Sequence, residues 1–295
     1  MSNLISVTGH LCNDYILTIE EYPPIGESRR VVNRENYFGG GAANIAVGIA
    51  LLGGESELIS AAGKDFPGSS YERHLQEVGV KTTLFTSEKN CSTAFMVNTT
   101  SGDQITYFEW GAGEVFASVS APKREFVHMA TGDAGFNIKA ARNADFASLD
   151  PGQDVKYYSK EQLEELFENI DLLICNNFEL NIMKDTTGYS ADEIIQAVPM
   201  AIITEGKNGS TIYADGGKTA VPACRVEAID PTGAGDAYRA GLFTAWKRGY
   251  DVETCCRVGA VVSSFAVEKI GTQTNLPSWQ QMEERYRVFF KGGIP

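Results

Sequence analysis

Short apolar runs of strand length alternate with helical segments along most of the chain, and this alternation constrains the fold more than any other feature. Strands are predicted at 4–9, 57–62, 126–130, 147–149, 172–175 and 201–204, and helices at 45–52, 71–78, 160–169, 237–247, 252–268 and 279–289. Strands that alternate with helices form a mostly parallel sheet covered on both faces. The sequence therefore predicts one α/β domain over residues 1–295.

Two stretches, about 12–37 and 91–112, do not fit this alternation. In the second stretch the runs 93–97 and 104–108 flank the polar segment 99–103, which is a hairpin pattern. We predict that the two stretches form a small β-sheet inserted in the domain, a candidate lid. The alternative is that they are two ordinary surface hairpins.

The net charge of −13 argues against a nucleic-acid partner, because neutralising phosphates needs clustered Lys and Arg. It argues equally against an anionic membrane surface. It does not exclude a nucleotide ligand, since backbone N–H groups at a helix end can bind a small phosphate group. The six cysteines include no Cys-x-x-Cys pair, and the N-terminus has no basic segment followed by an apolar run. We therefore predict a cytoplasmic protein with reduced thiols.

The most informative motif is DPTGAGD at 230–236, directly before a predicted helix. Glycines at a helix start let N–H groups approach an anion closely, and the helix dipole adds positive charge there. Gly233, Ala234 and Gly235 are therefore candidate donors to a phosphoryl group during transfer. Asp236 is a candidate base for a hydroxyl proton. The structural alternative makes Asp236 an ordinary helix N-cap and the glycines a tight turn.

Three further motifs lie at predicted strand or helix ends: GGGAAN at 39–44, NNFE at 176–179 and TEGKNG at 204–209. Strand ends form the usual crevice edge of an open α/β sheet, and oxygen ligands there can hold Mg²⁺ through water. The glycines of the third motif permit close approach to phosphates. The alternatives are a helix-capping role for Asn44 and a solvated loop acid for Glu179.

In order and spacing, these motifs resemble the signatures of the PfkB or ribokinase-like carbohydrate kinases, over essentially the whole chain from Gly9 to about Trp279. The segments 10–15, 104–112, 130–133, 150–154, 236–241 and 271–277 further resemble the archaeal broad-specificity nucleoside kinase branch. The resemblance implies a ribokinase-like three-layer sandwich with a mostly parallel central sheet and a small β-sheet lid. It also implies an enzyme that phosphorylates nucleosides at the 5′-hydroxyl with ATP and Mg²⁺.

The same resemblance gives each motif residue a role. Asp236 would deprotonate the 5′-hydroxyl while the glycine turn and Mg²⁺ balance the charge on the phosphoryl group. The implied substrate-binding residues are Asp14, Gly40, Asn44 and, on a candidate lid strand, Gln104; the ATP-binding residues are Asn176, Thr204, Gly206 and Gly209; and the metal ligand is Glu179. A carboxylate such as Asp14 accepts hydrogen bonds from a vicinal diol, although it could equally be a turn acid after a strand.

Partners and alternatives complete the hypothesis. The resemblance implies a homodimer through the lid and possible activation by a monovalent cation. A sugar or sugar-phosphate kinase is the alternative within the same chemistry, because Arg29, Arg30 and Arg34 beside the candidate lid would suit a sugar phosphate. A non-catalytic nucleoside or nucleotide sensor is the alternative of another class, and an intact Asp236 argues against it. A Rossmann-type oxidoreductase ranks third.

Overall fold

A large β-sheet forms the centre of the molecule. The computed structural model describes residues 3–294, and within them nine strands lie in the order β13 (Gly217–Val221), β12 (Ser210–Ala214), β11 (Met200–Thr204), β10 (Leu172–Asn176), β9 (Ala144–Leu149), β8 (Arg124–Met129), β1 (Leu4–Thr8), β4 (Glu55–Ala62) and β5 (Lys81–Thr86). Neighbouring strands in this sheet are parallel except in the two pairs that contain β12. The predicted mostly parallel sheet is confirmed.

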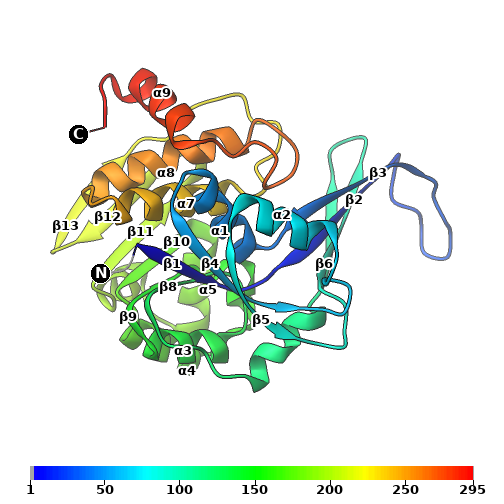
Figure 1. The fold of residues 1–295 in the computed structure, drawn as a ribbon, viewed down its shortest axis with the longest axis horizontal. Coiled ribbons are helices and arrows are strands. Elements are labelled where there is room, and N and C mark those ends of the chain that lie inside the picture. The colour runs from blue at the N-terminus through cyan, green and yellow to red at the C-terminus, as the bar shows by residue number, and fades with distance from the viewer. Residues whose placement is uncertain (1–2, 295) are drawn as a thin grey trace.

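Helices cover both faces of the sheet (Figure 1). One face carries α1 (Gly41–Leu51), α2 (Ser70–Val78), α7 (Ala234–Lys247), α8 (Val252–Ala266) and α9 (Trp279–Phe290), and the other carries α3 (Ala134–Arg142), α4 (Lys160–Asn169), α5 (Asn177–Thr187) and α6 (Ala191–Gln196). Short 3₁₀ segments, η1 (Gly111–Ser118), η2 (Gly152–Tyr157) and η3 (Gly206–Asn208), lie in the connections. Among residues 3–294, no helix is long and apolar enough to span a bilayer.

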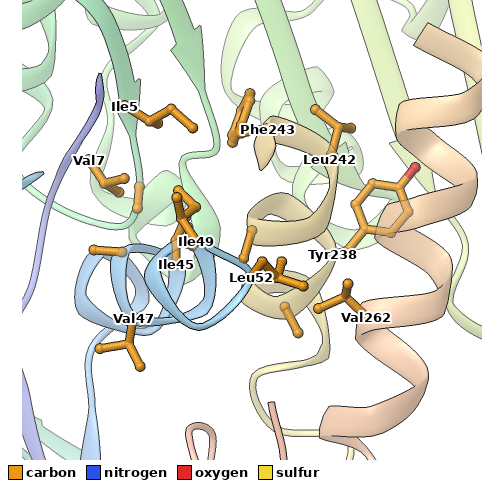
Figure 2. Close-up of a cluster of buried hydrophobic side chains, with 14 of the residues drawn as sticks. Ile5, Val7, Ile45, Val47, Ile49, Leu52, Tyr238, Leu242, Phe243 and Val262 are labelled. Atoms are coloured by element: carbon orange, nitrogen blue, oxygen red, sulfur yellow. The ribbon is translucent and has the colours of Figure 1, made fainter. Parts of the chain in front are cut away.

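The core beneath the first face holds α1 and α7 against each other. Figure 2 shows Ile5 of β1, Ile49 of α1 and Phe243 of α7 packed in this layer, and all three are fully buried. Where the helices meet, a Cβ added at Gly48 would lie 2.6 Å from the Ala240 Cβ. Contact through such small residues brings the two helix axes close and leaves no room for a larger side chain. The two glycine motifs, which begin these two helices, are therefore fixed relative to each other.

A second, smaller sheet projects beside the main body (Figure 1). Within the described residues its four strands have the order β3 (Val31–Gly39), β2 (Cys12–Ile19), β6 (Ser92–Thr99) and β7 (Gln104–Glu109). The central pair, β2 and β6, is parallel, and the two outer pairs are antiparallel. The predicted fold class, a parallel α/β sheet with a separate small sheet, is confirmed.

The sequence pattern did not predict four elements, namely β5, α3, α5 and α6. In α3 the reason is a buried polar residue, because Asn137 is 1% exposed and its amide donates to the Tyr158 hydroxyl at 3.0 Å. A polar residue on the buried side interrupts the apolar periodicity by which a helix is recognised. In α5 the Asn-x-x-Glu motif itself is the first turn, so that a segment taken for a loop continues as a helix.

Candidate active site

The site lies at the carboxyl ends of the parallel strands, beside β1. From β1 the chain first builds β4 and β5 on one side and later β8 to β11 on the other. The loops that follow two adjacent strands at such a reversal of strand order run in opposite directions. They leave a crevice between them, where α/β sheets usually bind their ligands. The backbones are close there, since a Cβ added at Gly9, after β1, would lie 2.6 Å from the Thr131 carbonyl oxygen, after β8.

Asp236 occupies the first turn of α7 and faces the start of α1. The N-cap of α7 is Gly233, with φ +78°, so the alternative that Asp236 is the N-cap is wrong. Its Oδ2 accepts a hydrogen bond from the Asn44 Nδ2 at 2.7 Å. A Cβ added at Gly41 would lie 3.5 Å from the Asp236 Oδ1, which leaves the carboxylate close to the α1 backbone. The two glycine motifs thus meet at one carboxylate.

The acidity of Asp236 suits a proton acceptor near neutral pH. Burial raises the pKa of Asp236 to about 7, while the hydrogen bond from Asn44 lowers that pKa. The Asp150 carboxylate raises it further and the Arg239 guanidinium opposes that effect. A general base is most effective when its pKa lies near the working pH, because it is then both ionised and basic.

Arg239 lies beneath the glycine turn and was not predicted as a site residue. It forms an ion pair with Asp150, Nε to Oδ2 at 2.5 Å, and both side chains are more than 90% buried. A Cβ added at Gly235 would lie 2.7 Å from the Arg239 Nη1, so the guanidinium contacts the turn directly. The sequence signal was present, since Arg239 belongs to the segment 236–241 quoted for its resemblance.

The predicted turn donors differ in their availability. The Ala234 N–H donates to the Pro231 carbonyl at 3.2 Å, so in this geometry it is already engaged. Gly235 is exposed and lies one residue further into the first turn of α7, where N–H groups point out of the helix end. The anion-binding role proposed for the turn therefore falls more on Gly235 than on Ala234.

Asp14 and Gly40 lie beside Asp236, as the motifs imply. Asp14 is 8% exposed, and burial raises its pKa to about 6. A Cβ at Gly39 would overlap the Asp14 carboxylate, at 2.0 Å from Oδ2, so only glycine lets the carboxylate lie there. A Cβ at Gly40, where φ is +92°, would lie 2.4 Å from the His10 carbonyl oxygen. The structure thus brings together Asp14, Gly40, Asn44 and Asp236.

Gln104 is not brought to this cluster. It begins β7 opposite Asn98 and donates from Nε2 to the Asn98 Oδ1 at 2.9 Å. Asp14 pairs with Ala94, four residues before Asn98 on β6. Four residues along a strand span about 13 Å, so Gln104 lies at the far end of the small sheet. Its substrate-binding role stays a prediction.

A cleft with a volume of about 750 Å³ lies on the other side of the glycine turn. Its walls include the predicted residues Thr204, Gly206, Gly209, Ala234 and Gly235, together with residues of α8. This volume falls within the usual range for small-molecule sites. At Gly209 φ is +100° and a Cβ would lie 2.1 Å from the Val221 carbonyl oxygen, so this loop position requires glycine.

Asn176 and Glu179 do not line that cleft but form a reciprocal capping box at the start of α5. The Asn176 backbone N–H and Nδ2 each donate to Glu179 at 2.8 Å, and the Asn176 Oδ1 accepts from the Glu179 N–H at 2.9 Å. Glu179 is 9% exposed, so the alternative of a solvated loop acid is wrong. Burial, followed by the Asp150 carboxylate, raises the pKa of Glu179 to about 7.

A divalent cation fits this arrangement only as part of a nucleotide complex. Among residues 3–294 there is no group of three or more His, Cys, Asp or Glu side chains arranged to hold a metal ion. Mg²⁺ is commonly bound by one or two carboxylates together with substrate phosphates and water rather than by an all-protein cage. A single buried carboxylate in the helical turn that follows β10, as Glu179 provides, fits that mode.

Two of the three arginines considered for a sugar phosphate, Arg29 and Arg34, are engaged away from the cluster. Arg29 is paired with Glu21 and Glu27 in the loop between β2 and β3. The Arg34 guanidinium lies over the Tyr15 ring, 5.3 Å from its centroid. Tyr15 is next to Asp14 on β2, so its side chain points to the opposite face of the small sheet. These positions do not favour a sugar-phosphate substrate.

Comparison with known proteins defines the class. The model of the pfkB family carbohydrate kinases matches residues 2–279, and the chain belongs to that family. The family resemblance deduced from the motifs is confirmed, and with it the expectation of a phosphotransferase.

Individual relatives narrow the class. The chain is 40% identical to a nucleoside kinase of Methanocaldococcus jannaschii, over 95% of this chain and 96% of that protein, and 37% identical to one of Methanothermobacter thermautotrophicus, over 94% of each. The crystal structure of the M. jannaschii nucleoside kinase superposes with a TM-score of 0.93 at 38% identity, covering 97% of this chain and 99% of that one. The nucleoside kinase of Burkholderia thailandensis in complex with inosine gives a TM-score of 0.87 at 26% identity, covering 98% and 99%. These similarities confirm the resemblance to the archaeal nucleoside kinase branch that the sequence motifs indicated.

Proposed function

We propose that this protein is a ribonucleoside kinase that transfers the γ-phosphoryl group of ATP to the 5′-hydroxyl of its substrate. The observation that carries the proposal is the meeting of Asp236 with Asn44 between the glycine turns of α1 and α7. The Asp14 carboxylate lies against Gly39 of the first glycine motif, and Ala234 and Gly235 of the second line the 750 Å³ cleft. An acceptor alcohol and a nucleotide can therefore approach the same carboxylate from two sides. The nucleoside kinases among the relatives support the choice of acceptor.

In this mechanism Asp236 accepts the proton of the 5′-hydroxyl as the hydroxyl oxygen attacks the γ-phosphorus in line. The bond from the γ-phosphorus to the β,γ-bridging oxygen breaks, and ADP leaves with that oxygen. The N–H groups at the start of α7 and the helix dipole stabilise the negative charge that spreads over the phosphoryl oxygens. Arg239, in contact with the turn from below, adds positive charge at the same point. ATP would occupy the cleft lined by Thr204, Gly206 and Gly209. Mg²⁺ bound near Glu179 would neutralise phosphate charge, and a monovalent cation is a further proposed activator.

The small sheet is proposed as a lid. Asp14 belongs to β2 of this sheet, whereas Asp236 belongs to the main body. A ribose held by Asp14 would therefore draw the small sheet towards the phosphoryl-transfer site and exclude water from it.

For Asp14→Asn we expect kcat/KM for guanosine to fall about 10- to 100-fold, because a charge-assisted hydrogen bond to the ribose hydroxyls is weakened. The preference for guanosine over 2′-deoxyguanosine should shrink at the same time, since the site would no longer leave a buried charge unpaired with the deoxy substrate. Steady-state kinetics with both substrates measures this. Asp145→Asn, an exposed aspartate on β9, is the matched control. Unchanged discrimination in Asp14→Asn would contradict the ribose-binding role.

Activity should rise with pH between about 6 and 8. The pKa of Asp236 is raised to about 7, so the carboxylate is protonated and unable to accept a proton below that pH. Asp14, with its pKa raised to about 6, acts in the same direction. The measurement is kcat/KM for a nucleoside from pH 5.5 to 9 at saturating ATP. A profile that is flat down to pH 5.5 would contradict the assignment.

The face of the small sheet opposite Asp14 is the proposed homodimer interface. Phe95, Ile105 and Tyr107 share this face and are 39%, 40% and 62% exposed. Exposed apolar side chains gathered on one face mark interaction surfaces. Light scattering should show a dimer that Tyr107→Asp dissociates and that Thr106→Asp, on the same strand but the other face, leaves intact. A monomeric unaltered protein would exclude this interface.

A coupled assay with ATP and Mg²⁺ across inosine, guanosine, adenosine, cytidine, ribose, fructose and fructose 6-phosphate tests the substrate class. Turnover of nucleosides well above the free sugars supports the proposal, whereas turnover of sugars alone would replace it with a sugar kinase. No turnover of any substrate would favour a nucleoside sensor.

The six cysteines are free and buried, which fits the cytoplasmic location proposed for the enzyme.

A further inference from the structure

Gln273 lies outside both glycine motifs and hydrogen-bonds Asn44, whose amide links the two motifs through Asp236. It lies in the connection between α8 and α9, and its Nε2 donates to the Asn44 Oδ1 at 2.8 Å and to the Tyr71 hydroxyl oxygen at 3.0 Å. Its Oε1 lies 3.0 Å from the His74 Nε2. The Tyr71 hydroxyl in turn donates to the Gly39 carbonyl at 2.7 Å. Asn44 and Tyr71 are 4% and 2% exposed, so water has little access to these bonds.

The direction of this chain of hydrogen bonds is determined by its ends. The Gly39 carbonyl can only accept, so the Tyr71 hydroxyl must give it its single proton. The Tyr71 oxygen then accepts, which turns the Nε2 side of Gln273 towards it. The same amide nitrogen faces Asn44, whose oxygen must therefore point to Gln273 and whose nitrogen must point to Asp236.

Thr272 cannot determine the orientation of Asn44 by itself. Its hydroxyl lies 2.9 Å from the Asn44 Oδ1 and 3.1 Å from the Phe38 carbonyl, and it has one proton for these two acceptors. If that proton goes to Phe38, the hydroxyl oxygen can accept from an Asn44 amide turned the other way round. Gln273 supplies the donor that makes one orientation of Asn44 preferable.

We propose that Gln273 is a positioning residue for phosphoryl transfer, which holds the Asn44 amide with Nδ2 towards Asp236 and so keeps Asp236 ready to accept a proton. The inference rests on the proposed role of Asp236 as the base. With the Asn44 amide reversed, a carbonyl oxygen would face the carboxylate. Two acceptors cannot share a hydrogen bond unless one is protonated, so Asp236 would retain its proton to higher pH.

Other charged groups around Asp236 set the background for this effect. Asp14 of β2, Asp150 after β9, Glu179 of α5 and Arg239 of α7 all interact with it or with each other electrostatically. Each of these groups acts in the unaltered protein and in the variants alike. A change in acidity caused by a substitution of Gln273 that adds no charge therefore reports the donor lost from Asn44.

Three variants separate the donor from charge and from folding. Gln273→Glu replaces the donor by acceptors and adds a charge, whereas Gln273→Met removes the donor without adding charge. Tyr71→Phe removes the hydroxyl that anchors the direction of the chain but leaves Gln273 in place. Gln76→Glu, on the exposed side of α2, is the control for an added charge. Thermal unfolding of each variant establishes that it is folded.

We expect the acid limb of the kcat profile to move up by about one pH unit in Gln273→Glu and by a smaller amount in Gln273→Met and Tyr71→Phe. At pH 7, kcat of Gln273→Glu should fall about fivefold, and above pH 9 it should return to within about twofold of the unaltered enzyme, because a one-unit shift in pKa changes only the ionised fraction. KM for ATP should not change, and Gln76→Glu should match the unaltered enzyme.

A loss of kcat that is equal at every pH, or an unmoved acid limb in Gln273→Met and Tyr71→Phe, would overturn the inference. The proposed base is tested separately. If Asp236→Asn is inactive while the acid limb is unmoved in the folded Gln273 variants, only the positioning role fails. If Asp236→Asn turns over normally, the base assignment fails with it.

Discussion

Asp236→Asn should lose at least about 10²-fold in kcat while it still binds nucleoside, because a positioned general base typically contributes about 10²- to 10⁴-fold to a rate. The substitution keeps the size of the side chain and its place beside Asn44 but removes its ability to take up the 5′-hydroxyl proton. Rapid-quench turnover of ATP and guanosine measures the loss, and calorimetric titration measures nucleoside binding.

Asp192→Asn is the matched control for this experiment. Asp192 is an exposed acid in the first turn of α6, just as Asp236 lies in the first turn of α7. The control therefore removes the same charge from the first turn of another helix without touching the site. Turnover by Asp236→Asn within a fewfold of the unaltered enzyme would take the base role away from this residue.

Arg239→Met should lower the free energy of unfolding by about 3–5 kcal/mol, the usual cost of removing one partner from a buried ion pair. The Asp150 carboxylate, about 90% buried, would be left without its counter-charge. Urea unfolding followed by circular dichroism measures the change. The cost should be partly recovered by adding Asp150→Leu, since the uncompensated carboxylate is then removed as well.

The exposed pair of Arg142 and Glu165 provides the comparison, with side chains 59% and 34% exposed. Arg142→Met should cost no more than about 1 kcal/mol, as surface ion pairs generally do. Equal losses in the free energy of unfolding for Arg142→Met and Arg239→Met would show that the buried pair beneath the glycine turn stabilises the fold no more than a surface ion pair does.

The fold and the core of the site follow from local patterns. Glycines with Asp236 at one helix start and glycines with Asn44 at another are recognisable because their spacing within one turn has a direct chemical use. The parallel sheet follows from the alternation of strands and helices. In each case the information lies within a few consecutive residues.

What the sequence could not provide depends on contacts between distant segments. Arg239 meets Asp150 across 89 positions (239 − 150), and Gln273 meets Asn44 across 229. Gln104 lies on a strand of the small sheet as expected, but only the strand register reveals that it starts at the end distant from Asp14. The Asn176–Glu179 motif is likewise ambiguous in sequence, because a capping box and a pair of metal-site residues share the same three-residue spacing.

The contact of Gly48 with Ala240 has a consequence for how the enzyme completes a cycle. Helices packed this closely are expected to move as one piece. We therefore expect the two glycine turns to keep the same separation in the empty, loaded and product-bound states. We then expect opening for product exit to occur in the chain segments that leave this pair, above all at the Phe38–Gly40 junction between β3 and α1. A catalytic cycle limited by that junction would be slowed by stiffening one short peptide segment, with the chemistry itself unaffected.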